Sequence, residues 1–307
     1  MAPLDELAAA TPPRDSYLTV GVFDGVHLGH RHLFDALVGE AAKAGWLAGV
    51  VTFRNHPSTV LDPGTVIPAI TDAEEQVRLI RELGIDFVVP ATFTLEVSKM
   101  TAEEFVSLLQ RYLRMRGLVV GPDFALGHHR EGTPEVIRKL GKKRGFSVAV
   151  VEPFTLDGHI VSSTAIRRAL AQRDVLAASS LLGRPFTLEG TVVRGDQRGG
   201  SVLDYPTANV QAASGMMVPG DGIYATWAYF GGQRYRAATS IGIRPTFGSN
   251  ERTVEAFILD YHGDLYNRSM KLEFIHYLRD EVKFESVERL KEQIDRDVEQ
   301  VRQLLDE

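Results

Sequence analysis

The feature that most constrains the fold is a glycine-punctuated turn at residues 21–30, which joins an apolar strand to a helix. Residues 17–23 are rich in β-branched and aromatic side chains and predict a buried strand. Leu33, Leu37 and Ala41 then recur at helical spacing. The first N–H groups of a helix have no internal partner and lie at the positive end of its dipole, so they attract anions. The turn therefore predicts a phosphate site.

Two histidines, His27 and His30, flank Gly29 inside this turn. Imidazole N–H groups can donate hydrogen bonds to phosphate oxygens and stabilise charge that builds on them, and Gly29 lets the backbone approach the ligand. There are two alternatives: His27, His30 and His32 bind a metal ion, or they are polar residues near a helix start. Because the chain has no cysteine and no further histidine pair at a recognised ligand spacing, a structural zinc site is disfavoured.

Length and charge bound the class of protein. The chain has 307 residues, enough for two domains, and its 34 basic and 40 acidic residues give a net charge of −6, which argues against a general nucleic-acid binder. The lack of cysteine excludes a disulfide framework and fits a cytoplasmic protein. The N-terminal residues lack a basic start followed by an apolar run, and no apolar stretch is long enough to span a bilayer. We therefore expect neither a signal peptide nor a membrane partner.

The first half alternates strands with helices. Thr71 with Glu74, and Thr101 with Glu104, predict capping boxes that open two of the helices. The predicted strands lie at 17–23, 47–53, 86–91, 118–121 and 147–152, and a further helix at 134–144. This alternation predicts a doubly wound parallel α/β sheet, whose ligand lies outside the carboxyl ends of the strands. The turn at 21–30 lies at that edge.

Three other stretches are predicted to reach the same edge: 52–57, 120–127 and 161–167. In the last, hydroxyl side chains from Ser162 to Thr164 open a helix and Arg167 lies just inside it, which again suits a phosphate. The alternative is an ordinary helix cap with Arg167 and Arg168 on a solvated face. The sequence has neither a Rossmann glycine fingerprint nor a Walker loop, which disfavours hydride transfer and P-loop hydrolysis.

The second half changes character near residues 171–186, where the alternation stops and 182–185 predicts a hinge. Short strands follow, separated by glycine-rich turns, at 187–193, 222–229, 234–241, 252–260 and 270–277. They predict a small antiparallel β-barrel. A terminal helix at 287–305 carries one apolar stripe of Val287, Leu290, Ile294, Val298, Val301 and Leu305. We expect domains at 1–172 and 185–307, joined by a linker at 173–184.

A second candidate site lies in the predicted barrel. The glycine-rich stretch 190–200 is followed by Thr207 and Asn209, whose hydroxyl and carboxamide oxygens can hold a hard cation beside phosphates, as a kinase requires. Glu255 is a candidate general base for a substrate hydroxyl. The alternative is that 206–209 form a turn with Asx capping and that Glu255 is an exposed strand residue.

Several of these stretches resemble a known enzyme superfamily. The turn at 21–30 resembles the His-x-Gly-His signature of nucleotidylyltransferases, and Phe23-Asp24-Gly25-Val26-His27 resembles its flavin branch. Residues 162–167 are similar to the second signature of the superfamily, and the stretch around Asp123 is similar to the Val-Gly-x-Asp-Phe segment of the same branch.

This resemblance implies roles for individual residues. His27 and His30 would be catalytic and would bind the ATP phosphates and the departing pyrophosphate, with Ser163, Thr164 and Arg167 closing over them. The FMN phosphate would attack the α-phosphorus directly, aided by Mg²⁺ and positive charge rather than by a protein nucleophile. The remaining implied contacts are with ATP, from Gly21, Phe23, Asp24 and Gly29, and with flavin, from Asp123, His56 and Pro57.

The second half resembles riboflavin kinase. Residues 206–209 match its Pro-Thr-Ala-Asn signature, and 222–225, 242–247 and 264–266 are similar to its later blocks. The resemblance implies that Thr207 and Asn209 carry Mg²⁺ with ATP, that Gly190 and Gly195 bind ATP phosphates, and that Glu255 accepts the proton of the flavin ribityl hydroxyl. Residues 200–205 depart from the family pattern: the basic residue after the glycine is missing and Asp204 is added, a change that would weaken ATP binding.

The order of the two resemblances is that of the bacterial bifunctional riboflavin kinase/FAD synthetase family. It implies a cytoplasmic enzyme that phosphorylates riboflavin to FMN and adenylylates FMN to FAD. The expected partners are riboflavin, FMN and ATP, with no nucleic acid and no membrane, and self-association stays open. One alternative is a nucleotidylyltransferase for another phosphate monoester, such as a nicotinamide or pantetheine phosphate, with a flavin-binding regulatory barrel. The other is a non-catalytic flavin-binding protein.

Overall fold

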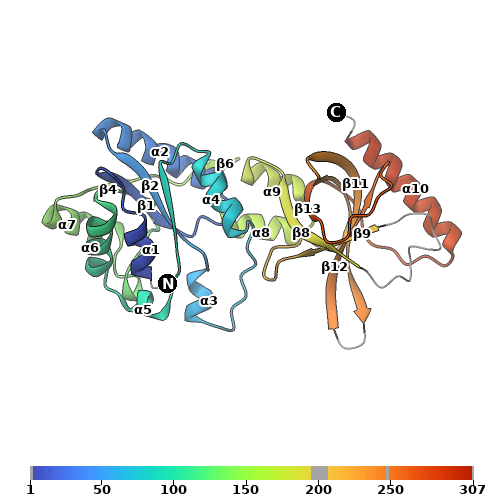
Figure 1. The fold of residues 1–307 in the computed structure, drawn as a ribbon, viewed down its shortest axis with the longest axis horizontal. Helices are drawn as coiled ribbons and strands as arrows, with labels where there is room; N and C mark the ends of the chain where they lie inside the picture. Colours follow the sequence, from blue (N-terminus) through green and yellow to red (C-terminus); the bar gives the residue numbers. More distant parts are fainter. Residues whose placement is uncertain (1–2, 195–206, 247–248, 306–307) are drawn as a thin grey trace. The chain divides into compact units, whose positions relative to one another are not determined.

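A five-stranded parallel sheet organises the first half of the chain, in the order β3-β2-β1-β4-β5 (Figure 1). Its strands span Ser16–Gly21 (β1), Leu47–Phe53 (β2), Phe87–Ala91 (β3), Met115–Val120 (β4) and Ser147–Val150 (β5). The structure is a computed structural model and describes residues 3–194, 207–246 and 249–305. From the central β1 the chain winds outward first to β2 and β3 and then, on the other side, to β4 and β5. The predicted doubly wound parallel sheet is confirmed.

Helices cover both faces of this sheet (Figure 1). The helices of the first half are α1 Pro3–Ala9, α2 Leu28–Ala44, α3 Pro57–Leu61, α4 Ala73–Arg81, α5 Leu95–Lys99, α6 Ala102–Leu113, η1 His128–Arg130 and α7 Pro134–Arg144. On one face, buried side chains of α2 and α4 pack against buried side chains of the strands. The helices contribute Phe34, Leu37, Leu79 and Ile80, and the strands Val50, Val88 and Val119. On the other face α1, α6 and α7 pack against the strands. The helices contribute Leu7, Leu109, Leu113 and Ile137, and the strands Leu18, Val51 and Leu118. A short hairpin, β6 Thr155–Leu156 with β7 His159–Ile160, follows.

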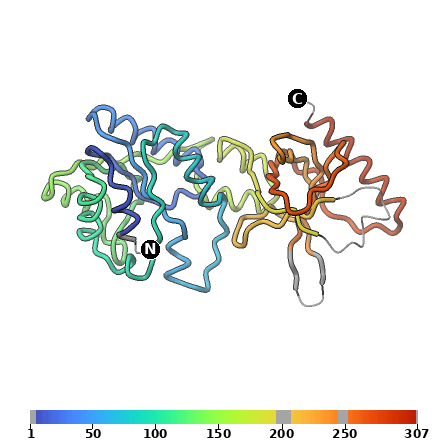
Figure 2. The backbone as a smooth tube through the Cα atoms, viewed as in Figure 1, coloured from blue at the N-terminus to red at the C-terminus, as the bar shows by residue number. Residues whose placement is uncertain are grey.

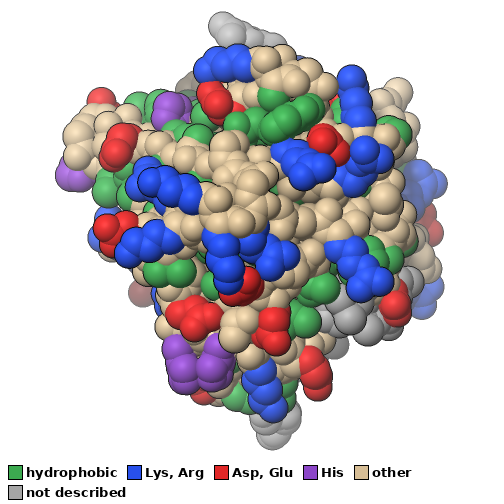
Figure 3. Space-filling model, turned by 90° about the vertical axis from the view of Figure 1, so that its left-hand side faces the viewer, with side chains coloured by type: hydrophobic (Ala, Val, Ile, Leu, Met, Phe, Trp, Pro, Cys, Tyr) green, Lys and Arg blue, Asp and Glu red, His purple; other side chains and the backbone are tan. Residues whose placement is uncertain are grey.

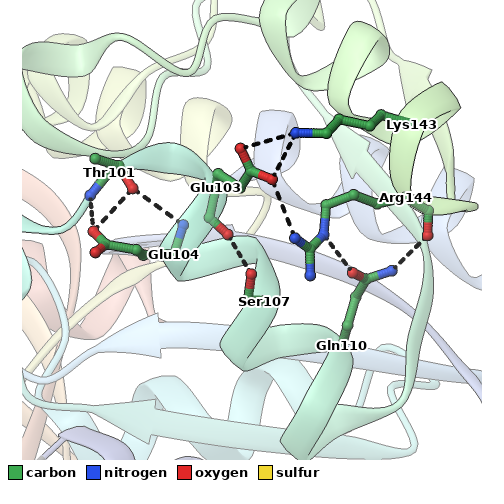
Figure 4. Close-up of polar contacts among 7 residues, drawn as sticks. All are labelled: Thr101, Glu103, Glu104, Ser107, Gln110, Lys143 and Arg144. Atoms are coloured by element: carbon green, nitrogen blue, oxygen red, sulfur yellow. Dashed lines mark hydrogen bonds and ion pairs between the residues drawn. The ribbon is translucent and has the colours of Figure 1, made fainter.

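Of the two predicted capping boxes, one is confirmed and one is wrong. Helix α6 begins with the predicted capping box, in which the Glu104 N–H donates to Thr101 Oγ1 at 3.2 Å and the Thr101 N–H donates to Glu104 Oε2 at 2.8 Å (Figure 4). The predicted cap of α4 by Thr71 is wrong. Asp72 is the N-cap, and its carboxylate accepts hydrogen bonds from the N–H groups of Glu74 and Glu75, both at 2.9 Å.

Helix α7 is rich in Lys and Arg, and Figure 3 shows acidic side chains interspersed among the basic ones on this face of the molecule. Glu103 of α6 lies 3.1 Å from Lys143 Nζ and 3.2 Å from Arg144 Nη1 of α7 (Figure 4). Hydrogen bonding to Lys143 lowers the pKa of the Glu103 carboxyl. Asp15 likewise accepts from Arg114 and Arg116, and the hydrogen bond from Arg116 lowers its pKa. The four cations Lys143, Arg144, Arg114 and Arg116 are therefore paired with carboxylates, and these pairs link neighbouring segments of the chain.

Six antiparallel strands form a closed barrel in the second half, in the order β10-β11-β12-β9-β8-β13. The strands span Phe186–Val193 (β8), Thr207–Ala212 (β9), Gly222–Phe230 (β10), Gln233–Thr246 (β11), Ser249–Ile258 (β12) and Ser269–Arg279 (β13), and α10 follows at Val287–Leu304. The predicted barrel with a terminal helix is confirmed. Strand β9 begins at Thr207, so the alternative of a turn is wrong for residues 207–209, whereas Glu255 does lie in a strand, β12, and is half-buried there.

Two helices precede the barrel, α8 at Ser163–Ala171 and α9 at Val175–Leu182. The chain divides into compact units at Met1–Ser163 and Thr164–Glu307, so both helices count with the barrel apart from the first residue of α8. The Gly220 N–H donates to the Leu170 carbonyl at 2.9 Å, and a Cβ atom at Gly220 would lie 2.7 Å from the Ala171 oxygen. This close approach fixes the end of α8 on the barrel. The expected domain boundaries at 172 and 185 stay predictions.

Helix α10 packs on the barrel through only part of its predicted apolar stripe. Val301 and Leu305 are buried against Ala225 and Leu259, whereas Val287 is 46% exposed. The helix is also held by charge: the Arg279 guanidinium of β13 contacts Asp297 of α10 at 2.6–3.1 Å, and Asp297 is only 4% exposed. Within the described part of the chain, no helix combines the length and apolar character needed to cross a membrane.

Two ion pairs of α10 provide a matched test of what holds it. We expect Asp297→Asn to lower the free energy of unfolding of the second unit by roughly 3 kcal/mol, because it breaks a buried pair and leaves Arg279 without its partner charge. Asp260→Asn is the control: Asp260 pairs with Arg302 at 2.6 Å but its side chain is 65% exposed, so we expect a loss below about 1 kcal/mol.

The measurement is urea unfolding of the full chain followed by the fluorescence of Trp227, which packs against the α10 cluster. The other tryptophan, Trp46, lies in the first unit and is replaced by phenylalanine in every variant. Equal losses from the two substitutions would contradict the assignment.

Candidate functional site

The turn between β1 and α2 has a strained backbone. Phe23 and Val26 have φ angles of 51° and 41°, and Gly25 has 85°. Side chains with a Cβ rarely adopt this region, and a β-branched valine does so least readily, so each such residue costs about 1–3 kcal/mol. A turn of this kind persists only where its surroundings hold it. It ends at His27, the N-cap of α2, whose Nδ1 accepts a hydrogen bond from the His30 N–H at 3.3 Å.

The two predicted histidines lie together at the start of α2. Their rings stack with centroids 3.5 Å apart at an interplanar angle of 19°, and Phe23 presents its ring edge-to-face to His30 at 5.3 Å. Burial lowers the pKa of His30 well below its ordinary value of 6.5, and the neighbouring His27 lowers it further. His30 Nδ1 is buried and has no hydrogen-bond partner among the described residues. The site thus presents a neutral imidazole beside a helix N-terminus.

His32 does not join this pair in a metal site. Its ring packs against Phe154 at 5.8 Å. Across the described ranges, no group of three or more His, Cys, Asp or Glu side chains is placed to hold a metal ion.

The stretch before α8 approaches the same turn. A Cβ atom at Gly29 would lie 3.1 Å from the Val161 carbonyl oxygen and 3.1 Å from the His27 ring, so only glycine fits here without a shift. The Ser163 hydroxyl donates to the Asp24 carbonyl at 2.9 Å. Of the predicted second signature, Ser163 therefore lies at the turn. Thr164 and Arg167 follow on α8 in the second unit, so their closure over the histidines stays a prediction.

Asp24, predicted to bind ATP, has a role within the protein itself. Its carboxylate accepts hydrogen bonds from the backbone N–H groups of Ile70, at 2.9 and 3.1 Å, and of Thr71, at 3.1 Å. The residue is 8% exposed. These bonds anchor the turn to the segment before α4. Gly21, at the end of β1, lies under the Phe23 ring, which a Cβ atom there would meet at 2.7 Å.

The residues predicted to bind flavin lie at strand ends on either side of β1. His56 is the N-cap of α3, after β2, and its Nδ1 accepts from the Ser58 N–H at 3.2 Å, while Pro57 is the first helical residue. Asp123 lies exposed in the turn after β4, and its carbonyl accepts from Arg130 Nη2 at 3.2 Å. Since the order of strands reverses beside β1, these loops border the crevice in which such sheets bind ligands. Their contact with flavin stays a prediction.

The barrel brings the second set of residues together. In the β9–β12 ladder Glu255 lies opposite Asn209, and the Thr207 hydroxyl donates to Glu255 Oε2 at 3.3 Å. The alternate residues Ala208 and Ala256 are buried in the barrel. Because side chains alternate across a strand, the hydroxyl, carboxamide and carboxylate share the outer face. This face gathers the oxygen ligands and the base that the sequence predicted separately.

A second carboxylate, which the sequence did not predict, lies beside this group. Glu281 accepts a hydrogen bond from the Ser240 hydroxyl at 3.1 Å, and Ser240 lies opposite Glu255 in the β11–β12 ladder. A Cβ atom at Gly242 would meet the Glu281 carboxylate, which is the flexible end of an exposed side chain and can move aside. None of the stretches singled out in the sequence contains Glu281.

Gly190, the first residue of the glycine-rich stretch 190–200, belongs to a strand. Gly190 lies inside β8, paired with Ala212 of β9 and Met270 of β13, and a Cβ atom there would lie 2.5 Å from the Gln211 carbonyl oxygen. The assignment of Gly190 to a loop is therefore wrong. Gly195, predicted to bind ATP phosphates, and Asp204 lie outside the described residues.

Comparison with known proteins agrees with both halves. Residues 9–165 match the family model of FAD synthetase, and residues 182–305 match that of riboflavin kinase. A bifunctional riboflavin kinase/FMN adenylyltransferase of Escherichia coli (strain K12) is 36% identical, over 93% of this chain and 91% of its own length. One of Pseudomonas fluorescens is 37% identical, over 95% and 93%. A crystal structure titled as a macrolide-efflux protein from Streptococcus pneumoniae has a TM-score of 0.89 and 30% identity, and 96% of each chain is covered.

The lowered pKa of His30 has a consequence for stability. Below pH 6.5 the unfolded chain takes up a proton on His30 that the folded, ligand-free chain does not. The unfolded state then binds more protons, so the free energy of unfolding of the first unit falls as the pH falls from 6.5 toward the lowered pKa. We expect His30→Asn to reduce the stability lost between about pH 7.5 and about pH 5.5.

The measurement is urea unfolding of the ligand-free chain followed by Trp46, which packs against Tyr17 in the first unit, in a Trp227→Phe background. His159→Asn is the control, because His159 is an exposed residue of the same unit. A pH-dependent loss that His30→Asn leaves unchanged would contradict a buried neutral imidazole.

Proposed function

The chain belongs to the bifunctional riboflavin kinase/FMN adenylyltransferase family, and from this premise we propose how its residues carry out the two reactions. The second unit phosphorylates riboflavin to FMN, and the site around β1 transfers AMP from ATP to FMN, which yields FAD and pyrophosphate. The observation that carries the proposal is the juxtaposition of His27 and His30 at the N-terminus of α2, where the strand order reverses. The family assignment also favours this function over another acceptor phosphate or a non-catalytic binding protein.

Adenylyl transfer uses the positive end of α2 and the two imidazoles. A phosphate oxygen of FMN forms a bond to the α-phosphorus of ATP, and the bond from that phosphorus to the bridging oxygen breaks as pyrophosphate leaves. His27 and His30 donate hydrogen bonds to the phosphates on which negative charge builds. The neutral His30 retains one N–H donor for this purpose. No side chain becomes covalently attached, so the turn acts by position and by its electric field.

Kinase chemistry uses the outer face of the barrel. Glu255 accepts the proton of the terminal ribityl hydroxyl as its oxygen bonds to the γ-phosphorus of ATP and ADP leaves. The Thr207 hydroxyl lies 3.3 Å from that carboxylate, so it orients Glu255 as well as presenting an oxygen to a ligand. Ser240 and Glu281 border the same face and extend its acidic, hydrogen-bonding character.

The donor set on this face fits Mg²⁺. Thr207, Asn209 and Glu255 offer a hydroxyl, a carboxamide and a carboxylate oxygen, and oxygen ligands together with substrate phosphates are what Mg²⁺ prefers. When bound with ATP, the ion neutralises charge on the phosphates. Thr207 and Asn209 would hold it, while Glu255 keeps its function as base. Two further expectations stay predictions: the protein has no nucleic-acid or membrane partner, and it is cytoplasmic. Self-association stays open.

The adenylyl-transfer assignment predicts a selective loss. We expect His27→Ala and His30→Ala each to lower kcat for FAD formation from FMN by about 10²-fold or more, because each removes a donor to the developing charge. Riboflavin phosphorylation by the same preparation should be unchanged, since Glu255 lies in the other unit. Product chromatography with ATP and Mg²⁺ measures both. FAD formation that survives both substitutions would contradict the assignment.

The kinase assignment predicts the reverse pattern. Glu255→Gln keeps the size of the side chain and removes the base, so we expect FMN formation from riboflavin to fall by about 10²-fold or more. FAD formation from supplied FMN should be unchanged. Glu189→Gln is the matched control, because Glu189 is an exposed β8 residue that accepts from the Ser269 hydroxyl. Equal loss of both activities in Glu255→Gln would reject the role of the residue.

A further inference from the structure

A single backbone carbonyl, that of Val22, fastens the strained turn to two other elements. It accepts a hydrogen bond from the Thr52 hydroxyl of β2 at 2.9 Å and one from Gln76 Nε2 of α4 at 2.5 Å. Thr52 is 1% exposed and Gln76 is 5% exposed. Buried polar side chains carry a desolvation cost unless they are hydrogen-bonded, so their presence here calls for a reason.

Val22 is a critical point in the chain. It follows the last residue of β1 and directly precedes Phe23, which has a φ angle of 51°, and Val26 with 41° follows. Such a backbone must be held from outside. Two donors from separate elements, both directed at one oxygen, fix that oxygen in position. The path of the backbone from Val22 to His27, the N-cap of α2, therefore depends on the position of this carbonyl.

The segment that carries Gln76 is itself tied to the turn. After α3 the chain makes a long excursion without helix or strand before it returns to α4 (Figure 2). On its return it places the N–H groups of Ile70 and Thr71 on the Asp24 carboxylate, and Gln76 then reaches Val22 from the first turns of α4. The turn is thus fastened at both Val22 and Asp24 to the segment 70–76.

We propose that Thr52 and Gln76 are positioning residues for adenylyl transfer, which act by holding the Val22 carbonyl and thereby the His27–His30 pair. The inference rests on the proposed function of that pair. It adds two residues that touch neither histidine through a described hydrogen bond. The sequence placed Thr52 at the ligand edge, within the stretch 52–57, but assigned no role to Thr52 or Gln76. They set where the imidazoles lie relative to the helix N-terminus.

The shared acceptor gives the proposal a distinctive signature. Loss of one donor leaves the half-buried Val22 carbonyl with the other, whereas loss of both leaves it without either side-chain donor. The effects of the two substitutions should therefore be non-additive. We expect Thr52→Val and Gln76→Met each to lower kcat for FAD formation by about 3-fold, and the double variant to lower it by about 100-fold, since small misplacements of reacting groups cost this much.

The experiment uses the full chain and compares kcat and KM for FMN across five proteins besides the wild type. These are the two single variants, the double variant, Thr52→Ser as the conservative variant that keeps the hydroxyl, and Thr19→Val as a matched control. Thr19 of β1 is also 1% exposed, but its hydroxyl has no hydrogen-bond partner among the described residues. We expect Thr52→Ser and Thr19→Val to retain kcat within about 2-fold, with KM for FMN unchanged throughout.

Riboflavin phosphorylation in the same preparation reports folding of the other unit, and Trp46 fluorescence in a Trp227→Phe background reports folding of the first. An additive double variant, or one that keeps wild-type kcat while folded, would overturn the proposal. So would a loss in Thr19→Val equal to that in Thr52→Val, because it would indicate general loosening of the sheet.

Imidazole NMR signals of the ligand-free protein separate this inference from the proposed function. The signals of His27 and His30 should shift in the double variant and stay in place in Thr52→Ser and Thr19→Val. If the wild-type chain makes no FAD from FMN, the proposed function is refuted. If the histidine signals of the variants nevertheless shift in this pattern relative to the wild type, the positioning role is supported. Unshifted signals in the double variant would overturn the positioning whatever the activity.

Discussion

The shared hydrogen bonds to the Val22 carbonyl are the interaction on which the first site depends. The turn after β1 holds Phe23 and Val26 at positive φ angles, a backbone that does not persist by local preference. Thr52 and Gln76 supply the restraint from β2 and α4. The residues that determine where the histidines lie are consequently distant from them in sequence, and the doubly wound sheet brings them together.

The two units position their reactive groups by different means. In the first, loops at the carboxyl ends of parallel strands carry the groups, so each loop must be anchored individually. In the barrel, strand register alone places Glu255 opposite Asn209 and next to Thr207. A slip of one residue in β9 would turn Thr207 and Asn209 into the core, where Ala208 now lies, so the apolar core also enforces the geometry of this face.

Local patterns predicted much of this architecture, and long-range contacts account for what they missed. Alternating strands and helices gave the sheet and its ligand edge, because those patterns depend on neighbours in sequence. Helix α1 escaped prediction because its place is set by Glu6, which accepts from the Thr92 N–H at 2.7 Å. The cap of α4 was misplaced by one residue for a similar reason: the Thr71 N–H is bonded to Asp24, and Asp72 caps instead. Neither contact can be predicted from the local sequence, because each joins residues that are far apart along the chain.

The stacked imidazoles also link electrostatics to ligand binding. Burial and the neighbouring His27 keep His30 neutral in the ligand-free chain. A bound polyphosphate would raise the pKa of His30, because nearby negative charge favours the protonated imidazole. By linkage, an anion that raises the pKa of His30 binds more tightly as the pH falls toward that pKa. The burial that costs stability in acid therefore also leaves His30 with a proton to gain when a phosphate occupies the turn.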